Sequence, residues 1–381
     1  MLIKGIKFNR QEFSGAFGDI GTDLPLLLAM ILAAGLYAPG VLIVFGLMQI
    51  FTGLVYKMPM PVQPLKAMAS IVIAQQIAGN VLLGAGLAIG LIMLILSLSG
   101  ALDKISKFIP KTVIRGLQLG LGISLCLLAL QKYLNSDGTA GYLIAFLSFL
   151  LIIFLYNNKK IPISLIVISI GFIYALLFNV RIDNILSSIG FNIPEFSIPS
   201  LENIAQGFVL LALPQIPLSL GNSIFATKQV SDDLFPQRKD ITIKKIGITY
   251  SVMNLIIPFF GGVPACHGSG GMVGHYTFGG RTGGSVIIYG LMFIVLGVFF
   301  GSNIEAVIKV FPLPVLGVIL IFEGLAIMSL VKDQIQNKKN LIIVLIVGII
   351  SVGLPYGFFI SMVIGTALYY FPFKLKLIEE F

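Results

Sequence analysis

The 381-residue chain has little charge, no tryptophan, two cysteines and two histidines. Charged residues make up 11% of it, against about 25% in ordinary soluble domains, and 57% of the residues are hydrophobic. So little charge excludes a soluble enzyme, and two cysteines in apolar stretches are too few for a disulfide framework or a zinc site. Mean hydropathy is +1.01. The sequence therefore predicts a polytopic membrane protein.

Apolar runs separated by short polar breaks recur along the whole chain. A hydrocarbon core about 30 Å thick needs roughly 20 apolar residues in a helix. These runs predict an all-α membrane protein with about fourteen transmembrane segments. The segments begin near Phe13, Tyr37, Leu65, Val81, Thr112, Gly141, Pro162, Glu202, Ile246, Ala265, Gly283, Phe311, Asn340 and Pro355. The third and tenth are short and follow proline-rich and glycine-rich stretches, which is typical of half-helices.

The basic residues are divided unequally between the two sides of this topology. With a cytoplasmic N-terminus and fourteen crossings, all but four of the 25 basic residues lie on the cytoplasmic side. Lys132, Arg181 and Lys309 lie outside, and Lys66 lies within a segment. This asymmetry predicts a multi-pass protein of the cell membrane with both termini in the cytoplasm. It also explains the net charge of +9 without a nucleic-acid partner.

Short motifs recur at an offset of about 203 residues, which indicates a duplication. The pairs are Gly18-Asp19 with Gly221-Asn222, Pro61 with Pro264, and Pro110 with Pro312. They mark two repeats, 1–200 and 201–381. Because each repeat has seven spans, an odd number, the second must insert upside down relative to the first. The expected architecture is therefore a pair of inverted seven-span repeats.

Polar residues inside the predicted spans cluster in four stretches, and such residues are functional candidates because burying them in lipid is costly. The stretches are Ser14–Pro25, Pro59–Met68, Leu213–Ser223 and Gly261–His275. Prolines in MPVQP and GGVPA exclude helix interior, so we expect extended segments that lead into helices beginning near Leu65 and His267. In an inverted repeat these two helix N-termini face each other and form an anion site, with Lys66 adding a full charge.

Several of these residues also have a purely structural interpretation, which the sequence leaves open. Glycines at 268, 270 and 271 would let an oxyanion approach the backbone, yet glycine in membrane helices also permits close packing. The other structural alternatives are a core histidine at His267, backbone capping by Asp19 and Asp23, a helix-to-helix hydrogen bond by Glu323 and snorkelling by Lys66.

The four stretches SGAFGDIGTDLP, PMPVQPLKAMAS, LPQIPLSLGNSIFA and GVPACHGSGGMVGHYTFGGR together resemble the molybdate transporter family, which is related to SulP-type sulfate permeases. The resemblance covers essentially the whole chain. It implies the SulP-like fold, shared with UraA-type nucleobase permeases. It also implies a core domain (about 13–100 and 202–301), a gate domain (about 105–200 and 305–373) and elevator-type alternating access. Because the chain ends soon after the fourteenth span, we expect no cytoplasmic STAS domain.

The resemblance also implies that the anion binds between the third and tenth half-helices. The predicted substrate-binding residues are Asp19, Thr22, Gln63, Pro64, Leu65, Lys66, Ala67, Gln215, Asn222, Cys266, His267, Gly268, Ser269 and Gly270. The candidates for coupling transport to an ion are Asp19, Asp23 and Glu323. No cofactor or metal is expected.

These features predict a secondary active importer of a tetrahedral oxyanion, with molybdate as the first candidate and tungstate and sulfate as alternatives. No Walker-type loop is present, so energy must come from a gradient, and a dianion entering a negative interior calls for at least two protons or other cations. A nucleobase permease of the same fold and an oxyanion channel remain alternatives. An enzyme using Cys266 and His267 is disfavoured, because neighbouring helical side chains point about 100° apart. The sequence does not decide whether the protein forms a homodimer.

Overall fold

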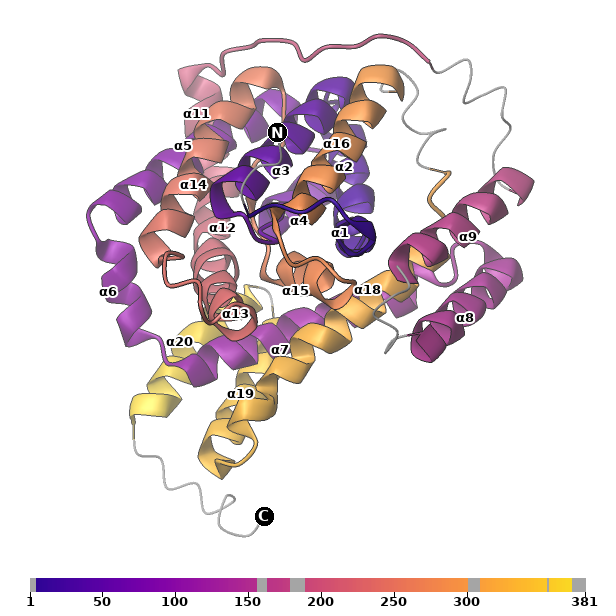
Figure 1. Cartoon of the computed structure of the whole chain (residues 1–381). Coiled ribbons are helices and arrows are strands. Elements are labelled where there is room, and N and C mark those ends of the chain that lie inside the picture. The colour runs from indigo at the N-terminus through magenta and orange to yellow at the C-terminus, as the bar shows by residue number, and fades with distance from the viewer. Residues whose placement is uncertain (1–4, 156–162, 179–188, 301–308, 355, 372–381) are drawn as a thin grey trace.

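The chain forms an almost entirely helical structure, in agreement with the predicted all-α membrane fold (Figure 1). This computed structural model describes residues 5–155, 163–178, 189–300, 309–354 and 356–371. The predicted segment starts at Pro162 and Pro355, and the tail from Lys374 to Phe381, lie outside these ranges. Within them, eight helices are long and apolar enough to cross a membrane, or nine if the bent pair α1 and α2 counts as one span.

The elements of the first half follow the predicted segments closely. They are α1 (Arg10–Ala16), α2 (Ile20–Ala34), α3 (Ala38–Tyr56), β1 (Val62–Pro64), α4 (Lys66–Gln75), α5 (Gly79–Leu98), α6 (Ala101–Phe108), α7 (Lys111–Leu128), η1 (Ala129–Tyr133), α8 (Gly138–Leu155) and α9 (Ile163–Phe178). The sequence analysis missed α6, whose eight residues bury Leu102 and expose Lys104 and Lys107. An amphipathic helix this short gives too few apolar residues to stand out from a connector.

The second half repeats this order, with more irregular helical turns. It contains α11 (Leu201–Gly207), η2 (Phe208–Ala212), α12 (Leu213–Leu218), η3 (Ser219–Ala226), α13 (Thr227–Leu234), α14 (Ile243–Ile256), η4 (Ile257–Phe260), β2 (Ala265–His267), α15 (Ser269–Thr277), α16 (Gly283–Phe300), α18 (Leu313–Met328), η6 (Ser329–Gln334), α19 (Lys338–Gly353) and α20 (Gly357–Tyr370). The turns η1, η2 and η3 are π-helical.

Each half-helix follows an extended segment, as the prolines predict, and the two segments pair as the antiparallel strands β1 and β2. One detail of the prediction is wrong. Helix α4 starts at Lys66, next to the expected Leu65, but α15 starts at Ser269 because the strand continues through His267. His267 pairs with Val62 across the two strands and does not open the helix.

The two strands are held from outside by amide side chains in equivalent ways. On α3, Gln49 accepts a hydrogen bond from the Val62 N–H (2.9 Å) and donates one to the Val62 carbonyl (2.7 Å). On α14, Asn254 does the same for Ala265, at 3.0 and 2.6 Å. Val62 and Ala265 lie at the 203-residue offset of the repeat. The matching contacts are what an inverted duplication predicts.

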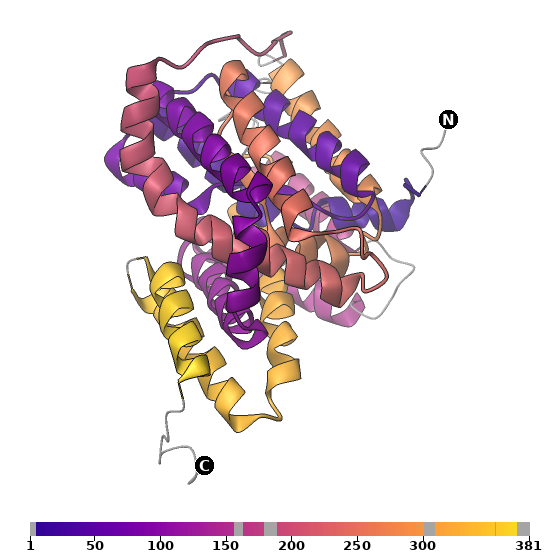
Figure 2. The same ribbon diagram turned by 90° about the vertical axis from the view of Figure 1, so that its left-hand side faces the viewer.

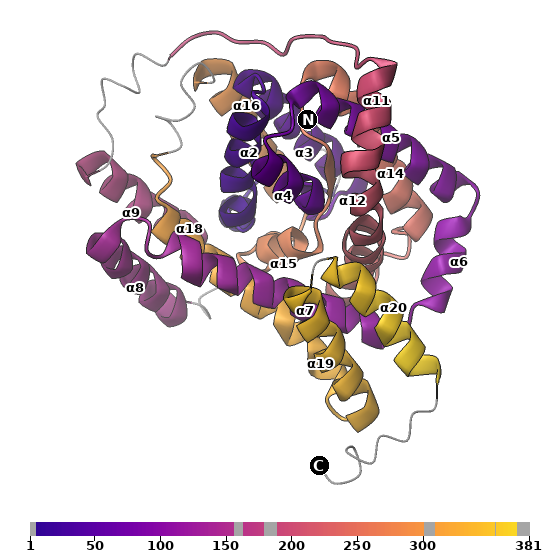
Figure 3. The same ribbon diagram turned by 180° about the vertical axis from the view of Figure 1, so that it is seen from behind.

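The described helices pack as two bundles, and α7 runs along the boundary between them in Figures 1 and 3. The strand-bearing bundle (10–98 and 201–300) packs α3 against α16 and α5 against α14. The peripheral bundle (111–178 and 313–370) packs α7 against α18, α19 and α20. Figure 2 shows the α19–α20 hairpin at the edge of the molecule. The bundles touch where α7 meets η3, where α18 meets α2 and α15, and where α20 meets α12.

Candidate functional site

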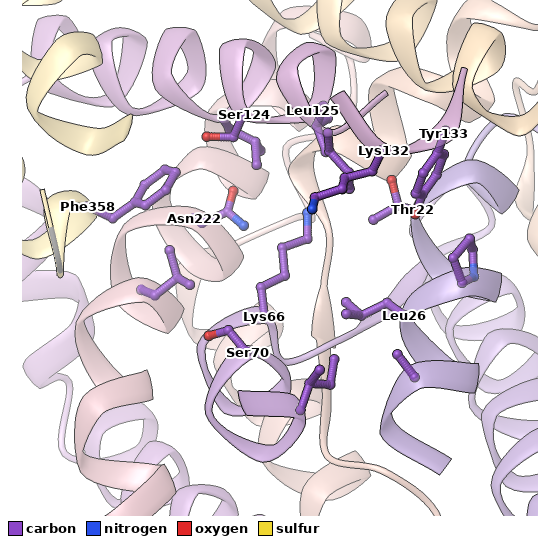
Figure 4. Close-up of a pocket in the computed structure, with 16 residues that line it drawn as sticks. Thr22, Leu26, Lys66, Ser70, Ser124, Leu125, Lys132, Tyr133, Asn222 and Phe358 are labelled. Atoms are coloured by element: carbon purple, nitrogen blue, oxygen red, sulfur yellow. The ribbon is translucent and has the colours of Figure 1, made fainter. Parts of the chain in front are cut away.

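A cavity of about 760 Å³ lies between the two bundles. Three of the predicted binding residues line its strand-bearing wall, each from a different element: Thr22 from α2, Lys66 from α4 and Asn222 from η3. On the opposite wall, α7 and η1 contribute Ser124 and Lys132 (Figure 4). The fold thus brings residues far apart in sequence around one space, which is lined mainly by apolar side chains with a few hydroxyl, amide and ammonium groups among them.

Lys66 is the residue through which the half-helix α4 reaches this cavity. It is the first residue of α4, and its side chain points into the cavity (Figure 4). Its Nζ atom is buried and has no hydrogen-bond partner among the described residues. Because a buried charge without a partner is costly, the cavity favours an anion at this position.

The first backbone amides of α4 are less available to an anion than the sequence predicts. Gln215 Oε1 accepts hydrogen bonds from the amides of Ala67 (2.9 Å) and Met68 (3.1 Å), so it caps the N-terminus of the half-helix. The Gln215 Nε2 donates to Ser219 Oγ at 3.1 Å, which fixes the orientation of the cap. Two amides expected to face an anion are therefore already paired, and the Lys66 side chain is the main contribution of α4.

The first turn of α15 faces carboxylates of the protein itself. A Cβ atom at Gly271 would lie 1.9 Å from Asp19 Oδ2, and one at Gly270 would lie 2.7 Å from Glu323 Oε1. These glycines thus admit the two carboxylates to the N-terminal end of a helix, where negative charge is stabilised. This corrects the expectation that the same glycines leave the backbone open to an oxyanion.

The three acidic coupling candidates are fully buried and lie near one another. The Gln63 Nε2 donates to both oxygens of Asp19, at 2.6 and 2.9 Å. The Tyr289 hydroxyl donates to Asp23 Oδ2 at 3.2 Å, and Asp23 and Glu323 interact electrostatically. All three carboxylates are also within electrostatic reach of the Lys66 ammonium.

Two cavity residues connect this acidic layer and α15 to the cavity. The Thr22 hydroxyl donates to Glu323 Oε2 at 3.3 Å. The Ser269 hydroxyl, at the start of α15, donates to Asn222 Oδ1 at 2.7 Å. A ligand that binds Thr22 or Asn222 can therefore change the hydrogen bonding of Glu323 or of the half-helix.

The remaining predicted residues lie behind the cavity wall. His267 Nε2 is 2.7 Å from Thr249 Oγ1, and its ring makes an edge contact with Tyr56. This is the core histidine that the sequence analysis kept as an alternative. Four further residues are buried in or beside the strand pair: Pro64, Leu65, Cys266 and Gly268.

The wall formed by α7 and η1 is not evident from the sequence. Ser124 lies within an apolar span, and Lys132 lies in a predicted connector. The only sequence signal for Lys132 is its position on the predicted outer side, where basic residues are scarce.

Comparisons with known proteins identify the family. The family described as "Molybdate transporter of MFS superfamily" matches residues 11–125 and 207–327. Molybdate transporters 1 and 2 of Arabidopsis thaliana are 30% and 31% identical to this chain. The matches cover 94% and 90% of this chain and 87% and 82% of the relatives. The putative sulfate transporter YbaR of Bacillus subtilis is 22% identical, over 78% of this chain and 63% of its own length.

Solved structures identify the fold. SLC26A9 is 13% identical with a TM-score of 0.59, and the match covers 94% of this chain and 64% of that chain. The transmembrane domain of the cyanobacterial bicarbonate transporter BicA is 19% identical with a TM-score of 0.54, and 95% and 98% are covered. The chain therefore has the fold of the SLC26 and SulP transporters, and it belongs to the molybdate transporter family, a family of membrane transporters and not of enzymes.

Proposed function

We propose that this transporter imports a tetrahedral oxyanion, with molybdate as the first candidate and tungstate and sulfate as alternatives. The main support is the Lys66 ammonium, which is buried, has no hydrogen-bond partner among the described residues and belongs to a side chain that points into the cavity. The Thr22 hydroxyl and the Asn222 amide line the same space. One full charge with neutral donors around it suits an oxyanion, and the named molybdate transporters among the relatives favour molybdate.

The proposed movement is an elevator-type exchange between the two bundles. In this proposal the strand-bearing bundle is the core that carries the anion, and the peripheral bundle is the gate. The cavity between the bundles and the small number of elements that touch across it support this division. The distribution of basic residues supports a cell-membrane location with both termini in the cytoplasm.

We infer that cations, in the first place protons, accompany the anion. Adding a dianion beside three carboxylates and one lysine concentrates negative charge unless positive charge enters as well. Asp19 and Glu323 occupy the end of α15 that stabilises negative charge. Protons on these carboxylates would leave that helix end available to the substrate. Each charge moved against a negative interior also costs about 2.3 kcal/mol per 100 mV, which the cations offset.

Uptake by proteoliposomes tests the proposal. We expect saturable uptake of radiolabelled molybdate that depends on an inward proton gradient and is inhibited by tungstate or sulfate. Replacing Lys66 by Met should raise the KM for molybdate about tenfold or more, because it removes the only full charge on that wall. Lys239→Met, in the exposed loop after α13, serves as the matched control.

The same experiment separates the alternative functions. Inhibition by uracil but not by oxyanions would identify a nucleobase permease and refute the proposal. Uptake that never saturates and ignores the gradient would identify a channel. An unchanged KM in the Lys66→Met variant would show that the anion binds elsewhere.

A further inference from the structure

A second lysine lines the cavity on the wall opposite Lys66. Lys132 belongs to η1, the π-helical turn that follows α7. Its side chain runs toward the Lys66 ammonium (Figure 4). Among the described residues, Lys132 takes part in none of the ion pairs, and the Lys66 Nζ has no hydrogen-bond partner. Two lysines, neither of which forms an ion pair within 4.0 Å among the described residues, thus line the same space from opposite bundles.

Lys132 belongs to an irregular turn that packs against α18. The amide of Leu134 donates to the Ala129 carbonyl at 3.0 Å, a bond that spans five residues and widens the helix. Next to Lys132, Tyr133 is 7% exposed, and its Cβ lies only 2.9 Å from where a side chain at Gly317 of α18 would begin. Tyr133 thus packs near α18 and also lines the cavity, next to the exposed Lys132.

Two ammonium groups that face each other repel, and an anion bound between them attracts both and offsets this repulsion. The carboxylates near Lys66 are Asp19, Asp23 and Glu323, and among the described residues none of them forms an ion pair with Lys132. With protons on the neighbouring carboxylates, as in the proposed function, a single lysine balances a monoanion, whereas two lysines balance a tetrahedral dianion.

We propose that Lys132 is the second cationic contact of the transported dianion and the residue that distinguishes dianions from monoanions of the same shape. This inference rests on the proposed oxyanion site at Lys66. Because the two lysines belong to different bundles, the dianion is held by both only when the cavity has the form seen here. Movement of the strand-bearing bundle then separates the substrate from Lys132.

The test compares two tetrahedral anions that differ in charge. In proteoliposomes, the KM for molybdate and the inhibition constant of perrhenate, a monoanion, are measured for the wild type, Lys132→Met and Lys132→Gln. We expect the KM for molybdate to rise about tenfold, which corresponds to about 1.4 kcal/mol, and the perrhenate constant to change less than about threefold. Lys132→Arg, which keeps the charge, should restore most of the preference for molybdate.

Lys309→Met is the matched control, because Lys309 is exposed, lies on the same predicted side and is absent from the cavity wall. If Lys132 only attracts anions from a distance, both lysine variants will weaken uptake to a similar degree, and the inference is wrong. The inference is also wrong if Lys132→Met raises the KM for molybdate and the inhibition constant of perrhenate equally. The same holds if Lys132→Met leaves the KM for molybdate unchanged while Lys66→Met raises that KM. In that last case the proposed function stands. Failure of the wild type to take up any oxyanion would instead refute the proposed function itself.

Discussion

At the residue scale, Glu323 links the cavity to the half-helix α15. One carboxylate oxygen accepts a hydrogen bond from Thr22 in the cavity wall. The other lies against Gly270, where a Cβ atom would be 2.7 Å away. A carboxylate in this position contacts both a residue of the cavity wall and the N-terminal end of the half-helix. These two contacts fit the proposed role of Glu323 in coupling.

We therefore expect Glu323→Gln to uncouple transport from its driving gradient. Glutamine keeps the shape and the hydrogen bond to Thr22 but carries neither the charge nor a transferable proton. Exchange of molybdate between the two sides of a proteoliposome should persist within about threefold of the wild type, whereas accumulation driven by a proton gradient should fall at least about tenfold. Both are measured with radiolabelled molybdate.

Glu202→Gln, on the exposed surface of α11, is the matched control and should change neither quantity. Normal accumulation by Glu323→Gln would remove Glu323 from the coupling mechanism and leave Asp19 and Asp23 as candidates.

At the same scale, the sequence identified Lys66 but not Lys132, and the reason is physical. A lysine inside an apolar span is costly, so it stands out from its neighbours. Lys132 follows an apolar span, where a lysine is ordinary. Its place on the cavity wall depends on the packing of η1 against α18, and that contact joins residues almost 200 positions apart.

At the scale of elements, the sheet has only the two strands β1 and β2 within the described ranges, so their outer backbone groups have no neighbouring strand there to pair with. Side chains supply these hydrogen bonds instead. Gln49 pairs with both backbone groups of Val62, and Asn254 pairs with both backbone groups of Ala265. Both amides are fully buried, so no water is at hand to replace them. The half-helices begin directly after these strands, and their positions depend on the strand geometry.

Gln49→Leu should accordingly destabilise the protein. The substitution leaves the N–H and the carbonyl of Val62 unpaired, at a cost of about 1 to 3 kcal/mol for each group. We expect a lower Tm in detergent, measured with a thiol-reactive dye that detects exposure of the buried Cys266, since the chain has no tryptophan. Gln206→Leu, on the exposed face of α11, should leave the Tm within about 1 °C. A wild-type Tm for Gln49→Leu would mean that the strand is held by its pairing with β2 alone.

The sequence predicted the extended segments because proline excludes helix, and it predicted the half-helices because they are short. It did not predict the π-helical turns η1, η2 and η3. Such turns arise when a helix gains one residue per turn to improve tertiary packing, and no local pattern records that. The paired amides Gln49 and Asn254 were also missed, because a polar residue in a span does not reveal which backbone it contacts.

At the scale of the whole molecule, the charge distribution and the duplication could be read from the sequence. Both are statistical properties of the chain and do not depend on side-chain geometry. The arrangement of the two bundles was implied only by the family resemblance. The contacts that control their relative position involve single residues from distant segments, and Arg115 is the clearest case.

Arg115 connects the two bundles at the end of α7 that lies opposite η1. Its guanidinium donates two hydrogen bonds to Asp233 of α13 in the strand-bearing bundle, at 2.6 and 2.9 Å. It also pairs with Asp333 of η6, which belongs to its own peripheral bundle, at 2.7 Å. The guanidinium is 3% exposed, so the pairs are protected from screening.

Asp233→Asn removes the charge that joins the bundles, whereas Asp333→Asn removes a charge of the same kind within one bundle. We expect only Asp233→Asn to loosen the contact between α7 and η3. Leu117 reports on that contact, because it is buried and its side chain lies 3.2 Å from where a Cβ at Gly221 would be. The test labels Leu117→Cys with a thiol reagent, after Cys126 and Cys266 have been replaced by serine.

Labelling should be at least about fivefold faster with Asp233→Asn, because breaking one partner of a buried ion pair shifts the balance between the closed and open forms. Asp333→Asn should change the rate less than about twofold, since Arg115 keeps its link across the bundles. Equal rates in the two variants would mean that the Arg115–Asp233 pair does not hold this end of the transporter closed. The cavity, which lies toward η1, would then be separated from the α13 end by apolar packing and by the hydrogen bond from Gln118 Nε2 to the Ala226 carbonyl.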